Sequence, residues 1–125
     1  MKLNEYQKRA MATCMSSCDN VSYMLHNLAA EVGEFAGKVA KARRREEVVF
    51  SRDGDMWWNT DKTAVAEGAE ELNAELKKEA GDILWQLSGL CHVMGWELED
   101  VATGNLEKLA SRKARGVIDG DGDNR

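Results

Sequence analysis

Two short segments of the sequence carry paired acidic residues in the same arrangement. One reads Glu31-Val-Gly-Glu34-Phe, and the other reads Glu79-Ala-Gly-Asp82-Ile. In both segments two acids stand three residues apart with a glycine between them, and residues at this spacing are neighbours on the surface of an α-helix. Each segment therefore predicts a helix that presents two carboxylates along one flank.

If the two helices pack together, the four carboxylates converge and repel one another unless cations neutralise them. Oxygen ligands select hard cations, and magnesium shared with the phosphates of a substrate is the usual case. A glycine inside a helix costs about 1 kcal/mol relative to alanine. Gly33 and Gly81 therefore suggest that the backbone there comes close to another group. The competing interpretation is a solvated acidic surface, because 22 acids in 125 residues produce pairs such as Glu67 and Glu70 by chance.

Each acidic segment lies on an apolar stripe whose steps of three and four residues indicate a helix. The first stripe comprises Val21, Leu25, Leu28, Val32, Phe35 and Val39. The second stripe comprises Leu72, Leu76, Ala80, Ile83, Leu87, Leu90 and Met94. We expect the first helix to follow the cap residues Asp19 and Asn20, and the second to begin near Ala66 and end at Gly95.

Two more helices are expected, at about residues 3–17 and at about residues 97–112. The inward face of the last helix is predicted to carry Val101, Leu106 and Leu109. The chain contains no proline, which favours helices over a turn-rich or all-β chain. We therefore predict an all-α fold in which residues 1–125 form one helical-bundle domain.

Two segments break the helical pattern. Residues 50–64 contain the turn signal Asp53-Gly54 and predict a loop or a short hairpin. The adjacent Trp57 and Trp58 are candidates for stacking on a nucleobase, and equally for covering an oligomer interface or the core. Residues from about 113 to 125 form a Gly- and Asp-rich tail, which either binds phosphate through its backbone or is a frayed terminus.

The composition argues against several classes of protein. The formal net charge of -5 is opposite to the basic footprint of a nucleic-acid binder, so no nucleic-acid polymer is expected as a partner. No apolar run approaches the roughly 20 residues that span a bilayer, and the N-terminal residues lack the apolar core of a signal peptide. We expect no membrane association and a cytoplasmic chain with its three cysteines reduced.

The order of the motifs resembles the MazG-like family of all-α NTP pyrophosphohydrolases. Leu28-Ala-Ala-Glu-Val-Gly-Glu-Phe is similar to the first motif of that family, and Glu79-Ala-Gly-Asp-Ile-Leu-Trp is close to its second motif. Downstream, Asn105-Leu-Glu-Lys108-Leu-Ala-Ser-Arg112 and the Gly-rich end resemble the closing segment of small phage and bacterial members. The long segment between the two motifs is a departure that bears on substrate identity.

The resemblance implies hydrolysis of an NTP or dNTP to the monophosphate and pyrophosphate, by a helical bundle assembled as a dimer or tetramer. It implies that magnesium, with manganese as a substitute, is held by Glu31, Glu34, Glu79 and Asp82. It also implies that three residues downstream bind the phosphates or sugar of the substrate, namely Asn105, Lys108 and Arg112.

In the mechanism that follows, water attacks the α-phosphorus and pyrophosphate leaves, with Glu34 as the candidate general base. Lys108 and Arg112 share a helix face, and Lys38 stands four residues after Glu34. These three cations would offset the charge on the departing pyrophosphate. Two other functions stay open: a non-catalytic helical oligomerisation module, and a sensor that binds a nucleotide without turnover. The base, the sugar and the choice between a normal nucleotide, a damaged one and an alarmone also stay open.

Overall fold

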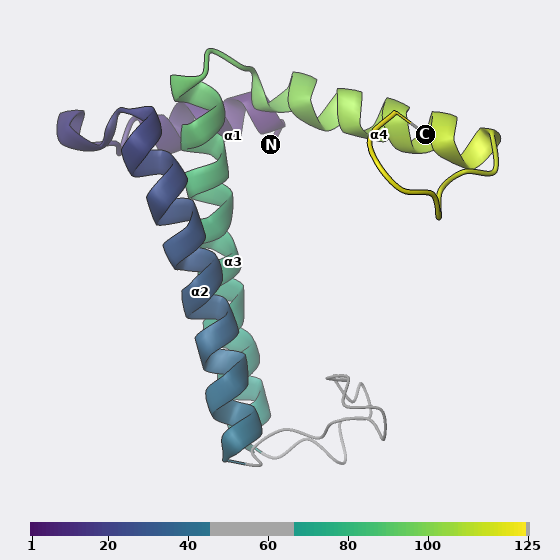
Figure 1. Cartoon of the computed structure of the whole chain (residues 1–125). Helices are drawn as coiled ribbons and strands as arrows, with labels where there is room; N and C mark the ends of the chain where they lie inside the picture. The colour runs from purple at the N-terminus through teal and green to yellow at the C-terminus, as the bar shows by residue number, and fades with distance from the viewer. Residues whose placement is uncertain (46–66, 125) are drawn as a thin grey trace. The chain divides into compact units, whose positions relative to one another are not determined.

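The computed structural model describes residues 1–45 and 67–124 (Figure 1). These residues form four α-helices and one short 3-10 helix, and they contain no strand, so the predicted all-α class is confirmed for this part of the chain. The elements in chain order are α1 (Leu3–Met11), η1 (Ser16–Cys18), α2 (Val21–Arg44), α3 (Glu67–Val93) and α4 (Leu98–Ala114). The loop or hairpin predicted at residues 50–64, with Trp57 and Trp58, lies outside the described residues.

The contacts between residues divide the chain into two compact units. We call Ser22–Leu87 the hairpin unit, and Met1–Val21 together with Ser88–Arg125 the terminal unit. The single domain predicted over residues 1–125 stays a prediction. Among the described helices, none is both long enough and apolar enough to cross a membrane.

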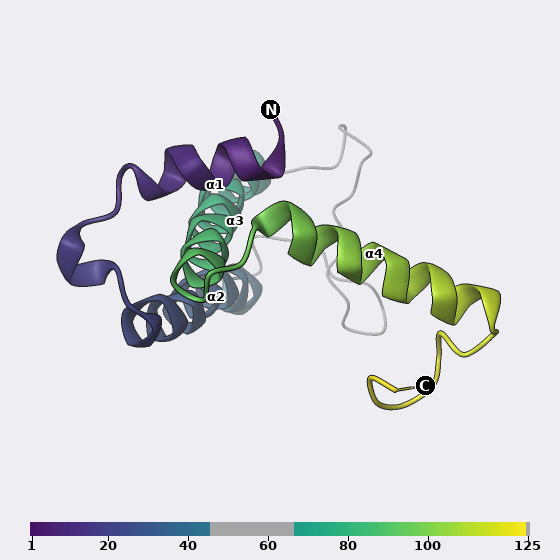
Figure 2. The ribbon, with the colours of Figure 1, turned by 90° about the horizontal axis from the view of Figure 1, so that it is seen from above.

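In the hairpin unit, α2 and α3 lie side by side and run in opposite directions (Figures 1 and 2). The buried apolar side chains of this unit are Met24, Ala42 and Leu76, and of these Leu76 alone belongs to a predicted apolar stripe. Other stripe residues remain open to solvent, since Leu25 is 51% exposed and Val32 is 49% exposed. Two helices therefore bury only part of each stripe, which is what a two-helix layer allows.

In the terminal unit, α1 supplies the caps for α4. The first residue before α4, Glu97, makes no side-chain cap. Instead the backbone N–H of Leu98 donates to Gln7 Oε1 at 3.0 Å, and the N–H of Glu99 donates to Asn4 Oδ1 at 2.9 Å. Gln7 is buried, and its amide nitrogen also donates to the carbonyl of Trp96 at 3.0 Å. Side chains from a distant helix thus satisfy the free N–H groups that begin α4.

The helix boundaries correct one prediction and support the others. The helix expected over residues 3–17 ends at Met11, and a 3-10 turn follows at Ser16–Cys18. The Thr13 hydroxyl donates to the carbonyl of Ala10 at 2.7 Å, a local bond that competes with a continuing helix. The third helix ends just before Gly95, whose φ of 73° suits glycine after a helix C-terminus.

The predicted inward face of the last helix is wrong for one copy of the chain. Leu106 is 67% exposed, and Val101 and Leu109 are exposed as well. The side chain that α4 does bury, apart from Leu98 at its start, is the cation Arg112. The spacing of the apolar residues predicted that they pack against a core, and the described residues of a single copy do not provide that core.

Candidate metal centre

Three of the predicted acidic residues meet between the two helices of the hairpin unit. Glu31 comes from α2, and Glu79 and Asp82 come from α3. Each offers a carboxylate oxygen, and these three oxygens lie within 4.8 Å of one another. Glu31 and Glu79 are partly buried while Asp82 is exposed, so the acidic cluster opens to solvent on one side. We call these three residues the acidic cluster.

Glu34 lies one helical turn beyond Glu31, is exposed, and does not belong to this group of converging oxygens. It is close enough to act on the cluster, because its charge contributes to the raised pKa of Glu31. Its predicted roles as a fourth ligand and as the general base stay predictions.

The electrostatics of the acidic cluster show a surplus of negative charge. The pKa of Glu31 is raised, mainly by burial and then by the charges of Glu34, Asp82 and Glu79. The Asn27 amide works in the opposite direction, because it donates to Glu31 Oε1 at 3.0 Å. A set of close oxygen donors whose mutual repulsion is only partly compensated fits a hard divalent cation such as Mg²⁺.

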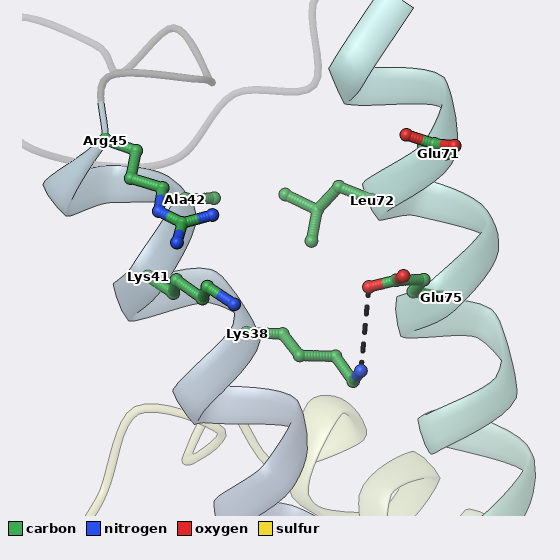
Figure 3. Close-up of a pocket in the computed structure, with 7 residues that line it drawn as sticks. All are labelled: Lys38, Lys41, Ala42, Arg45, Glu71, Leu72 and Glu75. Carbon is green, nitrogen blue, oxygen red and sulfur yellow. Dashed lines mark ion pairs between the residues drawn. The ribbon is translucent and has the colours of Figure 1, made fainter.

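Lys38 is the cation that lies against the acidic cluster. Its Nζ is 3.5 Å from a carboxylate oxygen of Glu79 and 3.5 Å from one of Glu75. The pKa of Lys38 is raised, first by the charge of Glu75. This Glu75 pair lies beside a cavity of about 320 Å³. Lys41 of α2 and Arg45, the residue after α2, also line the cavity, and Figure 3 shows both side chains on the α2 side. On α2, Lys38 therefore lies about two turns beyond Glu31, and Lys41 follows it in the direction of the cavity.

Comparison with known protein families identifies the family of this chain. A model of the MazG nucleotide pyrophosphohydrolase domain matches residues 20–117, which include both acidic motifs and α4. The chain belongs to the MazG family. It is also 35% identical over 132 residues to the Gene 37 protein of Mycobacterium phage L5, with both chains covered completely. No solved structure gives a significant match.

The other substrate residues predicted for this MazG-family chain lie on α4 in the terminal unit. Asn105 is exposed, and Lys108 Nζ is 3.6 Å from Asp123 Oδ1. Arg112 is only 5% exposed, and its Nη2 donates to the same oxygen of Asp123 at 3.0 Å. Lys108 and Arg112 therefore share one face of α4, as their spacing predicted, and one carboxylate of the chain itself bridges them. Their role toward a substrate stays a prediction.

Sequence reasoning missed two residues beside the acidic cluster. Asn27 stands four residues before Glu31, and Glu75 stands four residues before Glu79. Pairs at this spacing are neighbours on a helix, so the signal was present for both. It was not used because an amide and one more acid among 22 do not stand out without the fold.

The two motif glycines give a result that differs from the expectation. A Cβ added at Gly33 or Gly81 would meet no described atom within 4 Å. The close approach inferred from these glycines is therefore not made by any described residue of this chain.

Proposed function

We propose that this MazG-family chain is a magnesium-dependent pyrophosphohydrolase that converts an NTP or dNTP to the monophosphate and pyrophosphate. Glu31, Glu34, Glu79 and Asp82 would hold the metal, and manganese would substitute for magnesium. The observation that carries the proposal is the convergence of Glu31, Glu79 and Asp82 to within 4.8 Å in a chain of this family.

Bound magnesium would supply charge neutralisation at the triphosphate and a water of lowered pKa. The residues of the chain have separate tasks around it. Glu34 is exposed beside Glu31 and free of the converging group, which suits a general base for the attacking water. Lys38 already neutralises Glu79 and lies where it would meet the charge of the departing pyrophosphate. Asn105, Lys108 and Arg112 would bind the phosphates or the sugar.

We also propose that the active form is a homodimer or homotetramer. Large apolar side chains are exposed on all three long helices, including Leu25 on α2, Leu84 on α3 and Leu106 on α4. Large exposed apolar patches are rare on monomeric proteins and often mark interaction surfaces. A second copy would cover them, and it would also provide the core that α4 lacks.

The test is a pyrophosphate-release assay on the purified full-length chain with a panel of NTPs and dNTPs. Magnesium, manganese and EDTA form the three arms, and the panel includes damaged bases and alarmones. We expect release with at least one nucleotide, only in the metal arms. If the whole panel is left intact in both metal arms, the proposed activity is wrong. Metal-dependent nucleotide binding without release would identify a sensor instead.

A further inference from the structure

Asn27 is a neutral side chain that is hydrogen-bonded to the acidic cluster. It lies on α2 one turn before Glu31, is partly buried, and donates from Nδ2 to Glu31 Oε1 at 3.0 Å. A carboxylate has two oxygens that accept several bonds. An amide that occupies one of them fixes the orientation of the side chain and leaves the other for a ligand.

We propose that Asn27 is a positioning residue that holds Glu31 in the orientation needed to bind the metal; this rests on the proposed function. Residues that orient the ligands of a metal site typically affect metal affinity by about 10–100-fold when they are replaced. Asn27 touches neither substrate nor metal in this assignment. Its effect is therefore expected in the dissociation constant for the metal rather than in the stability of the helix.

The test compares the binding of Mn²⁺ alone to the wild type, Asn27→Ala and Asn27→Gln, measured by calorimetry without a nucleotide. Asn27→Ala should weaken binding about 10-fold or more, and Asn27→Gln should recover part of it because a longer amide still reaches Glu31. Asn73→Ala is the matched control, since it removes an exposed helical amide on α3. Wild-type affinity in Asn27→Ala would overturn the positioning role. A wild type that binds no Mn²⁺ would instead overturn the metal site itself.

A second, independent observation concerns the tail, residues 115–124. After α4, Gly116 adopts a φ of 69° and Gly122 a φ of 77°, and both values favour glycine. After α4 the chain turns back, and the tail runs back along the same side as α4 (Figure 2). Arg112 Nη2 then donates to the carbonyl of Asp123 at 3.0 Å as well as to its carboxylate.

The contact places one carboxylate oxygen between two cations of α4. Lys108 and Arg112 are one turn apart, and Asp123 Oδ1 lies 3.6 Å and 3.0 Å from them. Arg112 is buried, and its Nε has no hydrogen-bond partner in the described chain. A guanidinium and an ammonium that share one oxyanion are the arrangement that also binds a phosphate. The carboxylate of Asp123 thus occupies the two cations that are proposed to meet the substrate.

We infer that Asp123 is an intramolecular competitor, which occupies Lys108 and Arg112 until an incoming phosphate displaces it. The inference rests on the proposed function of these two residues. The Asp123 side chain is 86% exposed, so it can leave without disturbing a core. An exposed ion pair contributes little free energy, whereas a triphosphate or pyrophosphate brings several charges at once. We call the contact of Asp123 with Lys108 and Arg112 the latch. The latch would therefore weaken phosphate binding without preventing it.

The test uses Asp123→Asn, with Asp121→Asn as the control. Asp121 lies two residues earlier and is exposed, and it is not among the described residues that form an ion pair or a side-chain hydrogen bond. Both variants change the net charge equally. Asp123→Asn should bind inorganic pyrophosphate about 2–10-fold more tightly, because the competent state is no longer shared with the latch. KM for an accepted nucleotide should fall by the same factor with kcat unchanged, and Asp121→Asn should match the wild type.

Three results would overturn the latch. Pyrophosphate affinity could be the same in Asp123→Asn and the wild type, or neither protein could bind pyrophosphate. A higher KM in Asp123→Asn would show that the tail supports Arg112 rather than competing for it. Because pyrophosphate binding is measured without turnover, tighter binding by Asp123→Asn in a chain that hydrolyses nothing would support the latch while the proposed activity fails.

Discussion

The two units of this chain differ in how their charged side chains are arranged. In the hairpin unit, Glu31, Glu79 and Asp82 are brought together although they repel one another, and the pKa of Glu31 is raised, first by burial and then by the neighbouring charges. In the terminal unit, the cations Lys108 and Arg112 share a carboxylate of the same chain. There the pKa of Asp123 is lowered, first by the hydrogen bond from Arg112.

The difference indicates whether the opposite charge that each unit requires comes from a ligand or from the chain itself. Like charges that are held together cost free energy until a ligand of opposite charge arrives. Opposite charges that are already paired within the chain carry no such free-energy cost when no ligand is bound. In the hairpin unit Lys38 offsets part of the negative charge, and the remaining charge requires an external cation. In the terminal unit the cations Lys108 and Arg112 are paired within the chain. The predictions below test this contrast, beginning with the largest expected effect.

Neutralising one acid of the hairpin should remove the activity and make the metal-free protein more stable. We expect Glu79→Gln or Asp82→Asn to lower kcat/KM by roughly 100-fold or more, because a metal that stabilises charge in the transition state loses a ligand. Asp82→Asn should raise the melting temperature in EDTA, since it removes like-charge repulsion. Glu79→Gln should raise it less, because this variant also loses the ion pair between Glu79 and Lys38. Lower melting temperatures in EDTA would mean that these acids are stabilised by the chain itself, as Asp123 is.

Magnesium should stabilise the wild type, and more so at higher pH. The raised pKa of Glu31 means that the folded protein binds this proton more tightly than the unfolded protein does. The metal-free protein therefore loses stability as the pH rises from about 4.3, the ordinary glutamate value, through the raised pKa. Magnesium competes with the same proton, so its effect grows over this range.

At a concentration 100 times its dissociation constant, magnesium should add about 2.7 kcal/mol. Thermal melts at pH 5 and pH 7.5, with magnesium or EDTA, would measure the shift at each pH. Equal shifts at the two pH values would place the bound ion away from Glu31. No shift in either condition would contradict the idea that the hairpin awaits a cation.

The terminal unit should lose stability, and not metal binding, when its internal caps are removed. Gln7→Leu leaves the N–H of Leu98 and the carbonyl of Trp96 without their side-chain partner. An unsatisfied buried polar group costs about 1–3 kcal/mol, which chemical denaturation can measure. Lys8→Ala, an exposed change on the same helix, should cost much less. A large loss of Mn²⁺ affinity in Gln7→Leu would couple the two units and weaken the contrast.

The acidic cluster could be anticipated from the sequence because its signal is local. Two acids three residues apart on one flank of an apolar stripe need only a helix to become neighbours, and two such helices of one chain readily pair. The contacts of the terminal unit are different in kind. Gln7 caps Leu98 from 91 residues away, and no periodicity predicts which amide reaches which helix end.

The exposed stripes show a second limit of the sequence. A pattern of apolar residues tells which face of a helix is buried, but not whether the covering surface belongs to the same copy of the chain. Leu106 was expected inside and is 67% exposed in one copy. Arg112, a cation, takes the buried place on α4 because the tail supplies its partners. Which side chain of α4 is buried therefore depends on the path of the tail after the helix, which helical spacing does not predict.

The smallest predicted effect concerns two helical glycines, Gly81 and Gly104, of which we expect only Gly81 to be needed for activity. A Cβ at Gly81 or at Gly104 would meet no described atom within 4 Å. By helix propensity, alanine at either position should therefore add about 0.5–1 kcal/mol to the stability. We expect Gly81→Ala also to lower kcat/KM, because Gly81 lies between Glu79 and Asp82, where a substrate or a second copy would approach.

Gly104→Ala should gain the same stability and keep its activity, because Gly104 stands away from both acidic motifs in the sequence. Thermal melts and pyrophosphate release on the two variants decide the question together. Full activity in Gly81→Ala would show that nothing approaches the acidic cluster along that side of α3. The glycine would then be a neutral feature of the helix, and only the charges would distinguish the hairpin unit from the terminal unit.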